Sequence, residues 1–158
     1  MGQLTHFDRE GRAKMVDVSE KKVTKREAVV SADVIMRPRT LQMITRGKMA
    51  KGDVLSVAKV AGIMAAKRTS ELIPMCHPLK ISNIGITFNL KGKNRIQIKS
   101  KVNCLGRTGV EMEALMAASI SALTIYDMCK AVDRKMVISD VKLLKKTGGK
   151  SGVFIRRR

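Results

Sequence analysis

The stretch "GVEMEALMAASISALTIYDMCKAVD", Gly109–Asp133, decides the fold of this 158-residue chain. Between Thr108 and Cys129 it contains no Lys or Arg, although the whole chain has 32 of them. The 13 residues from Ala114 to Tyr126 carry no charge, and a helix that is apolar on all sides is normally buried. A charge-free run of this length is too short to span a membrane. The sequence therefore predicts a long helix buried in the core.

The acidic residues of this segment lie at its two ends. Glu111 and Glu113 fall in the predicted first turn, where carboxylates interact favourably with the helix dipole and need no further role. Asp127 lies near the other end, where the dipole disfavours an acid. Lys130, three residues later, can pair with it. A structural and a functional interpretation of the pair between Asp127 and Lys130 both remain open.

The spacing of the acids limits what one subunit can do. Glu113 and Asp127 are 14 residues apart, so in one straight helix they lie on nearly the same face but ~21 Å from each other. A small ligand could hardly touch both. If both act on a substrate, either the ligand is long or a neighbouring subunit completes the site. An oligomer with active sites at its interfaces is the economical hypothesis.

Other segments of the chain predict strands and shorter helices. Arg37–Gly47 suits a short helix, with Pro38 in its first turn and Gly47 as its stop. Gly52–Arg68 suits a second helix, whose apolar face comprises Val54, Val57, Ala58, Ala61, Met64 and Ala65. Residue alternation predicts strands at Met15–Ser19, at Arg26–Met36, at Ile84–Leu90 with Ile96–Val102 as a hairpin through Lys91–Asn94, and at Met136–Lys146. We therefore expect an α+β fold, with helices packed on a largely antiparallel sheet.

The length of the chain fits a single domain, 1–158. We expect a polar N-terminal segment at about 1–13 and a basic C-terminal tail at about 153–158. The first residues lack the apolar segment of a secretory signal, and no apolar run is long enough for a membrane span. The three cysteines, Cys76, Cys104 and Cys129, are far apart and odd in number. They indicate reduced thiols, so we expect a cytoplasmic protein without membrane contact.

The formal net charge of +19 predicts a polyanionic partner, which could be nucleic acid, an acidic membrane or a small polyphosphate. Proteins that bind single strands usually present aromatic side chains for stacking, and this chain has three Phe, one Tyr and no Trp. A basic nucleic-acid-binding module is therefore the alternative prediction. The acidic segment without cations disfavours it, because a DNA-binding protein has no obvious use for such a helix.

Two stretches could hold a phosphate. "TGGKSG", Thr147–Gly152, resembles the end of a P-loop, but the first glycine of that motif would fall at Leu144 and too few residues follow for its helix. The backbone amides of this Gly-Gly turn could still bind an anion, together with Lys146 and Lys150. Lys51 stands just ahead of a predicted helix N-terminus, which also favours anions. For each of these lysines, an exposed surface side chain is the simpler interpretation.

The stretch "LIPMCHPLK", Leu72–Lys80, places Cys76 and His77 between two prolines. A zinc site needs about four ligands, and His6 is 71 positions from His77, so we expect no metal. Adjacent residues in extended backbone point in opposite directions, so we expect Cys76 to face inward if His77 faces out. His77 is then either a single acid, base or ligand contact, or a structural histidine.

Together with "MVDVS", "KREAVVSA" and "KGDVLSVAKVAGIMAAKRTSELIPMCHPLKIS", the motifs "GRTGVEMEALMAASISALTIYDMCKAVD" and "LLKKTGGKSG" resemble the molybdenum cofactor biosynthesis C family, the cyclic pyranopterin monophosphate synthases. The resemblance runs from about Leu4 to Gly152. It implies a ferredoxin-like α+β fold and a homohexamer, a trimer of dimers with active sites at subunit interfaces. The implied lyase reaction converts a small-molecule, GTP-derived cyclised intermediate into cyclic pyranopterin monophosphate and diphosphate, with no cofactor.

The resemblance also assigns the site residues. It implies active-site positions at Lys51, His77, Glu111, Glu113, Asp127, Lys130 and Lys146, with Met75, Cys76 and Met112 in contact with substrate through backbone or packing. The position of Asp127 usually carries the catalytic role. We hypothesise that the lysines of this set, with Arg26, supply positive charge for the leaving diphosphate. On this hypothesis Asp127 with Lys130 transfers protons, while Glu113 and His77 position the part of the substrate that becomes the pterin.

Overall fold

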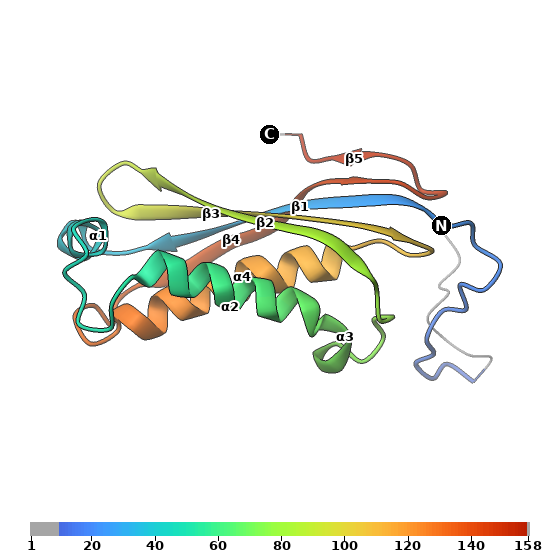
Figure 1. Cartoon of the computed structure of the whole chain (residues 1–158), viewed down its shortest axis with the longest axis horizontal. Helices are drawn as coiled ribbons and strands as arrows, with labels where there is room; N and C mark the ends of the chain where they lie inside the picture. The colour runs from blue at the N-terminus through green and yellow to red at the C-terminus, as the bar shows by residue number, and fades with distance from the viewer. Residues whose placement is uncertain (1–9, 158) are drawn as a thin grey trace.

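The strands of this protein form one antiparallel sheet, and the two long helices, Val54–Lys67 and Glu111–Cys129, cover one of its faces (Figure 1). The computed structural model describes residues 10–157. Its elements are β1 (Thr24–Ile35), α1 (Pro38–Thr45), α2 (Val54–Lys67), α3 (Thr69–Leu72), β2 (Ile81–Lys91), β3 (Arg95–Gly106), α4 (Glu111–Cys129), β4 (Val137–Thr147) and β5 (Phe154–Ile155). The strand order is β2-β3-β1-β4-β5. The predicted α+β fold of ferredoxin-like type is confirmed.

Strand β1 lies at the centre of the sheet, between β3 and β4. Its residues Ala28, Val30, Ala32 and Val34 are fully buried and face the helices, as the alternation predicted. The residues between them, such as Ser31 and Asp33, are also buried, because side chains of both neighbouring strands cover them. The predicted hairpin is confirmed as well, with Ile84 opposite Val102 and Phe88 opposite Ile98.

Helix α4 is buried along one face, where small residues bring it close to its neighbours, while Leu123 on another face is 52% exposed, so the predicted burial on all sides is confirmed only in part. Ala114, Ala117, Ala118 and Ala122 have no exposed surface. Ser121 Oγ donates to the carbonyl of Ala58 in α2 at 3.0 Å, and Ser100 Oγ in β3 donates to the carbonyl of Ala114 at 2.7 Å. These bonds satisfy buried hydroxyls while they join α4 to α2 and to the sheet. The helix ends at Cys129, four residues before the predicted end.

The apolar face of α2 differs from the prediction. Ala58, Ala65 and Val54 are buried, but Val57 and Met64 are 46% and 44% exposed. Gly62 explains the difference, because it has no side chain and lets α2 pack against α4 at this position. The face of α2 that contains Gly62 is therefore the buried one, and Val57 and Met64 lie outside it. The helix begins as expected, with Asp53 accepting from the backbone N–H of Ser56 at 3.0 Å.

Two segments near the chain ends also depart from the prediction. The strand predicted at Met15–Ser19 is wrong, because residues 15–18 form coil without a ladder partner and Ser19 begins a turn. The basic tail begins with a strand, since β5 pairs with β4 through Phe154 opposite Lys146. Residues 1–9 of the polar N-terminal segment lie outside the described part of the chain. Residue 158, at the end of the basic tail, also lies outside it. Helix α3, a single turn, was not predicted.

Within residues 10–157, no helix combines the length and the apolarity that crossing a bilayer requires.

The contact at Gly62 predicts a steric limit on this position. A Cβ there would overlap Ser121 Oγ and lie 2.7 Å from the carbonyl oxygen of Ala117 and 2.6 Å from Cδ1 of Ile86. We expect Gly62→Ala to lower the free energy of unfolding by about 1–3 kcal/mol, as overpacking does in other cores. Chemical denaturation measures the change. Gly85→Ala is the matched control, since the nearest atom to its Cβ would be 4.0 Å away; an equal loss in both variants would contradict the close-packing argument.

Candidate active site

The residues predicted for the site form two clusters at opposite ends of α4. The carboxyl-end cluster comprises Lys51, Asp127 and Lys130. The amino-end cluster comprises Met75, Cys76, His77, Glu111, Met112 and Glu113, with Arg26 and Lys146 beside it. The helix between them keeps Glu113 and Asp127 ~21 Å apart, as the spacing predicted. A single subunit therefore does not bring the two clusters together.

In the carboxyl-end cluster, one carboxylate holds two ammonium groups. Lys51 Nζ lies 2.9 Å from Asp127 Oδ2 and also donates to the backbone carbonyl of Asp127 at 3.1 Å. Lys130 Nζ lies 2.7 Å from Asp127 Oδ1. All three side chains are about half exposed. The predicted pair between Asp127 and Lys130 is thus present, and Lys51 joins it from the loop ahead of α2.

The two lysines set the charge state of this cluster. Hydrogen bonds from Lys130 and Lys51 lower the pKa of Asp127 to about 2, and the same carboxylate raises the pKa of Lys130. Asp127 and Lys130 therefore stay ionised at neutral pH. The cluster carries one net positive charge, close to solvent, which suits contact with an anion.

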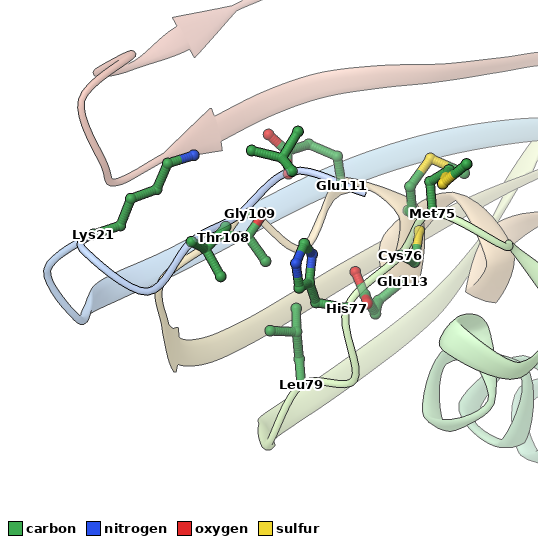
Figure 2. A pocket seen from close by; sticks show the side chains of 12 residues that line it. Lys21, Met75, Cys76, His77, Leu79, Thr108, Gly109, Glu111 and Glu113 are labelled. Atoms are coloured by element: carbon green, nitrogen blue, oxygen red, sulfur yellow. The ribbon is translucent and has the colours of Figure 1, made fainter. Parts of the chain in front are cut away.

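At the other end of α4, a cavity of about 260 Å³ opens between the loop of His77 and the first turn of the helix (Figure 2). His77 and Glu113 lie next to each other in it, with Cys76 and Met75 on the same side. Thr108 and Gly109, from the loop before α4, line the side nearer Lys21. The cavity combines apolar walls with an imidazole and a carboxyl group, so it suits a flat polar ligand.

Glu113 is the buried acid of this cavity. It is 4% exposed, and burial, with a smaller contribution from the charge of Glu111, raises its pKa. The favourable helix dipole does not outweigh this burial, because the pKa of Glu113 is raised rather than lowered. A carboxyl group whose pKa is moved toward neutrality can both donate and accept a proton.

Cys76 and His77 do not point in opposite directions as expected, because both line this cavity. The N–H of Cys76 donates to the carbonyl of Ile73 at 3.0 Å, which closes a turn just ahead of these two residues. Burial, followed by the charge of Glu113, raises the pKa of the Cys76 thiol. A thiol with a raised pKa is a poor nucleophile, which disfavours a nucleophilic role for Cys76.

A second cavity, of about 340 Å³, adjoins the first and is basic. The two share Lys21, Thr108, Gly109 and Glu111. Its remaining lining comprises Arg26, Glu27, Arg107, Lys146, Thr147, Gly148, Lys150 and Ser151. The glycine turn that was predicted to bind an anion therefore lies beside the His77 cavity.

Arg26 is fixed against the glycine turn. Its Nε and NH2 groups donate to the carbonyls of Gly106 and Arg107 at 3.2 and 3.0 Å. Gly148 and Gly149 have φ of 97° and 75°, and a Cβ at Gly149 would overlap the guanidinium. Both glycines are thus required, for backbone conformation and for close approach. On the other side of the cavity Lys146 Nζ lies 3.6 Å from Glu111 Oε1 and contacts Ser151.

The sequence missed several residues of these cavities. Val16 and Val18 line the first cavity from the segment that was predicted as a strand, and Lys21 lines it from the turn that follows. The alternation that suggested a strand is real, because Val16 and Val18 face the cavity. Thr108 and Arg107 were also missed, although the glycines of the loop before α4 could have marked it as a binding loop.

Elsewhere, a wider cavity of about 1130 Å³ lies on the face of the sheet away from the helices, and its lining includes Lys99, Lys142, Arg156 and Arg157. Glu27 pairs there with Lys101 and Lys145 at 2.8 and 3.1 Å. Much of the positive charge therefore lies away from both clusters. Within residues 10–157, no three His, Cys, Asp or Glu side chains gather closely enough to hold a metal ion.

Comparisons with known proteins identify relatives of this chain over nearly its whole length. The model of the MoaC family matches residues 15–149. A protein of Thermoanaerobacter pseudethanolicus named cyclic pyranopterin monophosphate synthase is 60% identical over 154 residues, 97% of this chain and 98% of the relative. Proteins with the same name from Desulfitobacterium hafniense and Heliobacterium modesticaldum are 60% and 57% identical, and cover 98% and 99% of this chain and 94% and 99% of their own.

The burial of Glu113 predicts how its stability contribution depends on pH. Because burial raises its pKa, ionisation at neutral pH costs the folded state free energy, whereas Gln cannot ionise. We expect Glu113→Gln to raise the melting temperature at pH 7, and the gain to shrink as the pH falls below the pKa of Glu113. Thermal unfolding between pH 4 and 8 measures this. Glu71→Gln, at an exposed acid of α3, is the control; a Glu113→Gln protein that melts lower at pH 7 would contradict the assignment.

Proposed function

The chain belongs to the MoaC family, and from this premise we infer that it is a cyclic pyranopterin monophosphate synthase, a lyase of molybdenum cofactor biosynthesis. Its substrate is a cyclised dihydro-GTP intermediate, and its products are cyclic pyranopterin monophosphate and diphosphate. The observation that carries the proposal is the pair of adjoining cavities. One holds His77 and the buried Glu113, and the other is basic, which suits a purine-derived ring that carries a triphosphate.

We place the complete active site between two subunits. Ile120 lies seven residues from both Glu113 and Asp127. A two-fold axis near Ile120 would pair α4 with its copy in antiparallel orientation, so each amino-end cluster would meet the carboxyl-end cluster of the other subunit. Exposed apolar side chains support contact through the helices, since Val57, Val60, Met64 and Leu123 are 44–61% exposed. Such a dimer contains two equivalent sites.

The dimer is the unit of a larger assembly in this proposal. We propose a homohexamer, a trimer of such dimers, in the cytoplasm. The three free cysteines, Cys76, Cys104 and Cys129, support an environment that keeps thiols reduced.

Release of diphosphate is the step that needs positive charge. When a ribose hydroxyl attacks the nearest phosphorus, a bond from that phosphorus to the bridging oxygen breaks and negative charge develops on the leaving diphosphate. Arg26 and Lys146 of one subunit, with Lys51 and Lys130 of the other, surround the proposed position of these phosphates. Their charges stabilise the leaving group more than the ground state, because its charge grows during the step.

The proton transfers of ring opening and ring closure are assigned to the amino-end cluster. Glu113 supports this role because burial brings its pKa toward neutrality. Asp127 has the opposite property: with a pKa of about 2 it is a weak base at neutral pH. This differs from the role that the sequence suggested for Asp127. We assign it the orientation of Lys51 and Lys130, both of which it contacts.

The remaining residues position the ring. His77 lies beside Glu113 in the cavity, where it can hold or protonate a polar atom of the substrate. Met75, Cys76 and Met112 form the adjacent wall, so they contribute packing and backbone contacts. The alternative of a nucleic-acid-binding module would use the basic cavity on the sheet but leaves Glu113 and His77 without a role.

Removal of single charges should reduce turnover of the cyclised intermediate by purified protein. We expect Lys51→Ala and Asp127→Asn to lower kcat by about 10²–10³-fold, the usual effect of deleting one group that stabilises developing charge. Quantified release of diphosphate and of the cyclic product measures it. Lys48→Ala, an exposed lysine in the same loop, is the matched control. Wild-type turnover by either site variant would refute the role of that residue.

The shared site predicts recovery of activity from two inactive proteins. We expect Glu113→Gln and Asp127→Asn subunits, mixed in equal amounts and allowed to exchange, to regain about a quarter of wild-type activity. Half of the dimers are then mixed, and each mixed dimer has one intact site of two. Mixing Glu113→Gln with His77→Asn should give no recovery, because both changes lie in the same half-site. Absence of recovery in the first mixture, after exchange is verified, would place both clusters' functions within one subunit.

A further inference from the structure

Asp133 is a buried carboxylate to which the proposed reaction gives no role. It lies in the turn after α4, six residues beyond Asp127, and only 1% of its surface is exposed. A buried charge is costly unless hydrogen bonds compensate for its lost hydration. The contacts of Asp133 therefore indicate what it does.

These contacts join Asp133 to the start of α1. Its Oδ2 accepts from the backbone N–H of Arg37 at 2.8 Å and from Thr40 Oγ1 at 3.0 Å. Its Oδ1 accepts from the N–H of Lys135 at 3.1 Å, and the guanidinium Nε of Arg37 lies 3.8 Å away. Arg37 is the N-cap of α1 and makes no side-chain cap, and the first turn of α1 has no acid. Asp133 thus caps α1 from a different part of the chain. Its negative charge interacts favourably with the positive, N-terminal end of the helix dipole.

The capped helix leads directly to Lys51. Helix α1 ends at Thr45, and the loop that follows is anchored by Met49, which is 7% exposed. Lys51 then reaches the carbonyl and the carboxylate of Asp127. From Asp127 the chain returns to Asp133 through a turn in which the N–H of Asp133 donates to Cys129. The contacts close a ring: Asp133 to α1, α1 to Lys51, Lys51 to Asp127, and Asp127 along the chain to Asp133.

We propose that Asp133 is a positioning residue for the carboxyl-end cluster, which fixes Lys51 against Asp127 by holding the start of α1. The proposal rests on the function proposed above for Lys51 and Asp127. Rotation of α1 by a small angle at its capped end moves the far end of the helix and the loop that carries Lys51. A displacement of about 1 Å can cost as much as 10²-fold in rate.

The charge of Asp133 is present throughout the working pH range. Burial alone would raise its pKa, but hydrogen bonds from the Arg37 N–H, from Thr40 and from the Lys135 N–H, together with the Arg37 charge, hold the pKa below its ordinary value. The charged groups that face Asp127 are Lys130 and Lys51. Because Lys51 is one of the two that lower the pKa of Asp127, that pKa reports where Lys51 stands.

Asp133→Asn tests the proposal. An Asn side chain has one acceptor oxygen and one NH₂ donor group. In one orientation its NH₂ group would face the N–H of Lys135, and in the other it would face Thr40 and the N–H of Arg37. We expect two effects in the folded variant. The pKa of Asp127, followed by NMR of its carboxyl carbon, should rise from about 2, because Lys51 moves away. For the cyclised intermediate, kcat should fall about tenfold or more, with a smaller change in KM.

Asp33→Asn is the matched control. Asp33 is 4% exposed and pairs with Arg95 at 3.2 Å, but it lies on the sheet face away from the helices. The Asp33→Asn protein should have a lower free energy of unfolding, with no change in the pKa of Asp127 or in kcat. If Asp133→Asn does not fold, Thr40→Val removes one of its hydrogen bonds and should shift both readouts in the same direction by less.

The two readouts separate failure of this inference from failure of the proposed function. Wild-type values of both in Asp133→Asn would overturn the positioning role and leave the function intact. A raised pKa of Asp127 with unchanged kcat would support the positioning role and contradict the catalytic use of Lys51 and Asp127. Equal losses of kcat in Asp33→Asn and Asp133→Asn would reduce Asp133 to general stability and overturn the proposal.

Discussion

The close packing of α4 is the constraint on which the rest of the structure depends. Alanine, serine and glycine at its contacts bring α2, α4 and the sheet so near that no charged side chain can lie between them. The helix consequently has no charge along its middle, and all of its ionisable groups lie at its ends. The same packing makes α4 rigid, so the distance between those ends does not adapt to a ligand. A substrate that needs both ends must find the second one on another subunit.

The two ends of α4 differ in burial, and burial decides their chemistry. Glu113 faces the cavity under the His77 loop and loses hydration, so its pKa is raised. Asp127 is exposed and lies between two ammonium groups, so its pKa is lowered to about 2. Pairs of carboxylates with opposite shifts commonly divide acid–base work from electrostatic work. In a dimer joined through α4, Glu113 of one subunit and Asp127 of the other would meet in one site. Within one subunit the two acids would remain too far apart to affect each other's pKa.

Much of the fold could be predicted because its signals are local. The charge-free helix, the central strand and the hairpin each follow from residue periodicity, which depends on burial of one face. Periodicity failed where burial came from another source. Val57 and Met64 have the spacing of core residues, yet α2 packs against α4 through the face that contains Gly62. Val16 and Val18 alternate because they line a cavity rather than pair in a sheet. In both cases the deciding partner lies far away in the sequence.

The candidate site followed a similar division. Local spacing predicted the pair of Asp127 and Lys130, and it predicted that a small ligand could hardly touch Glu113 and Asp127 of the same subunit. It could not predict that Lys51 approaches the same carboxylate, because that contact joins residues 76 positions apart. Nor could it separate the roles of the acids, since spacing carries no information about hydration. Asp133 shows this limit most clearly. In the sequence it is one more acid after the helix α4, and only the fold brings it to the N-terminus of α1, where it accepts hydrogen bonds from the Arg37 N–H and Thr40.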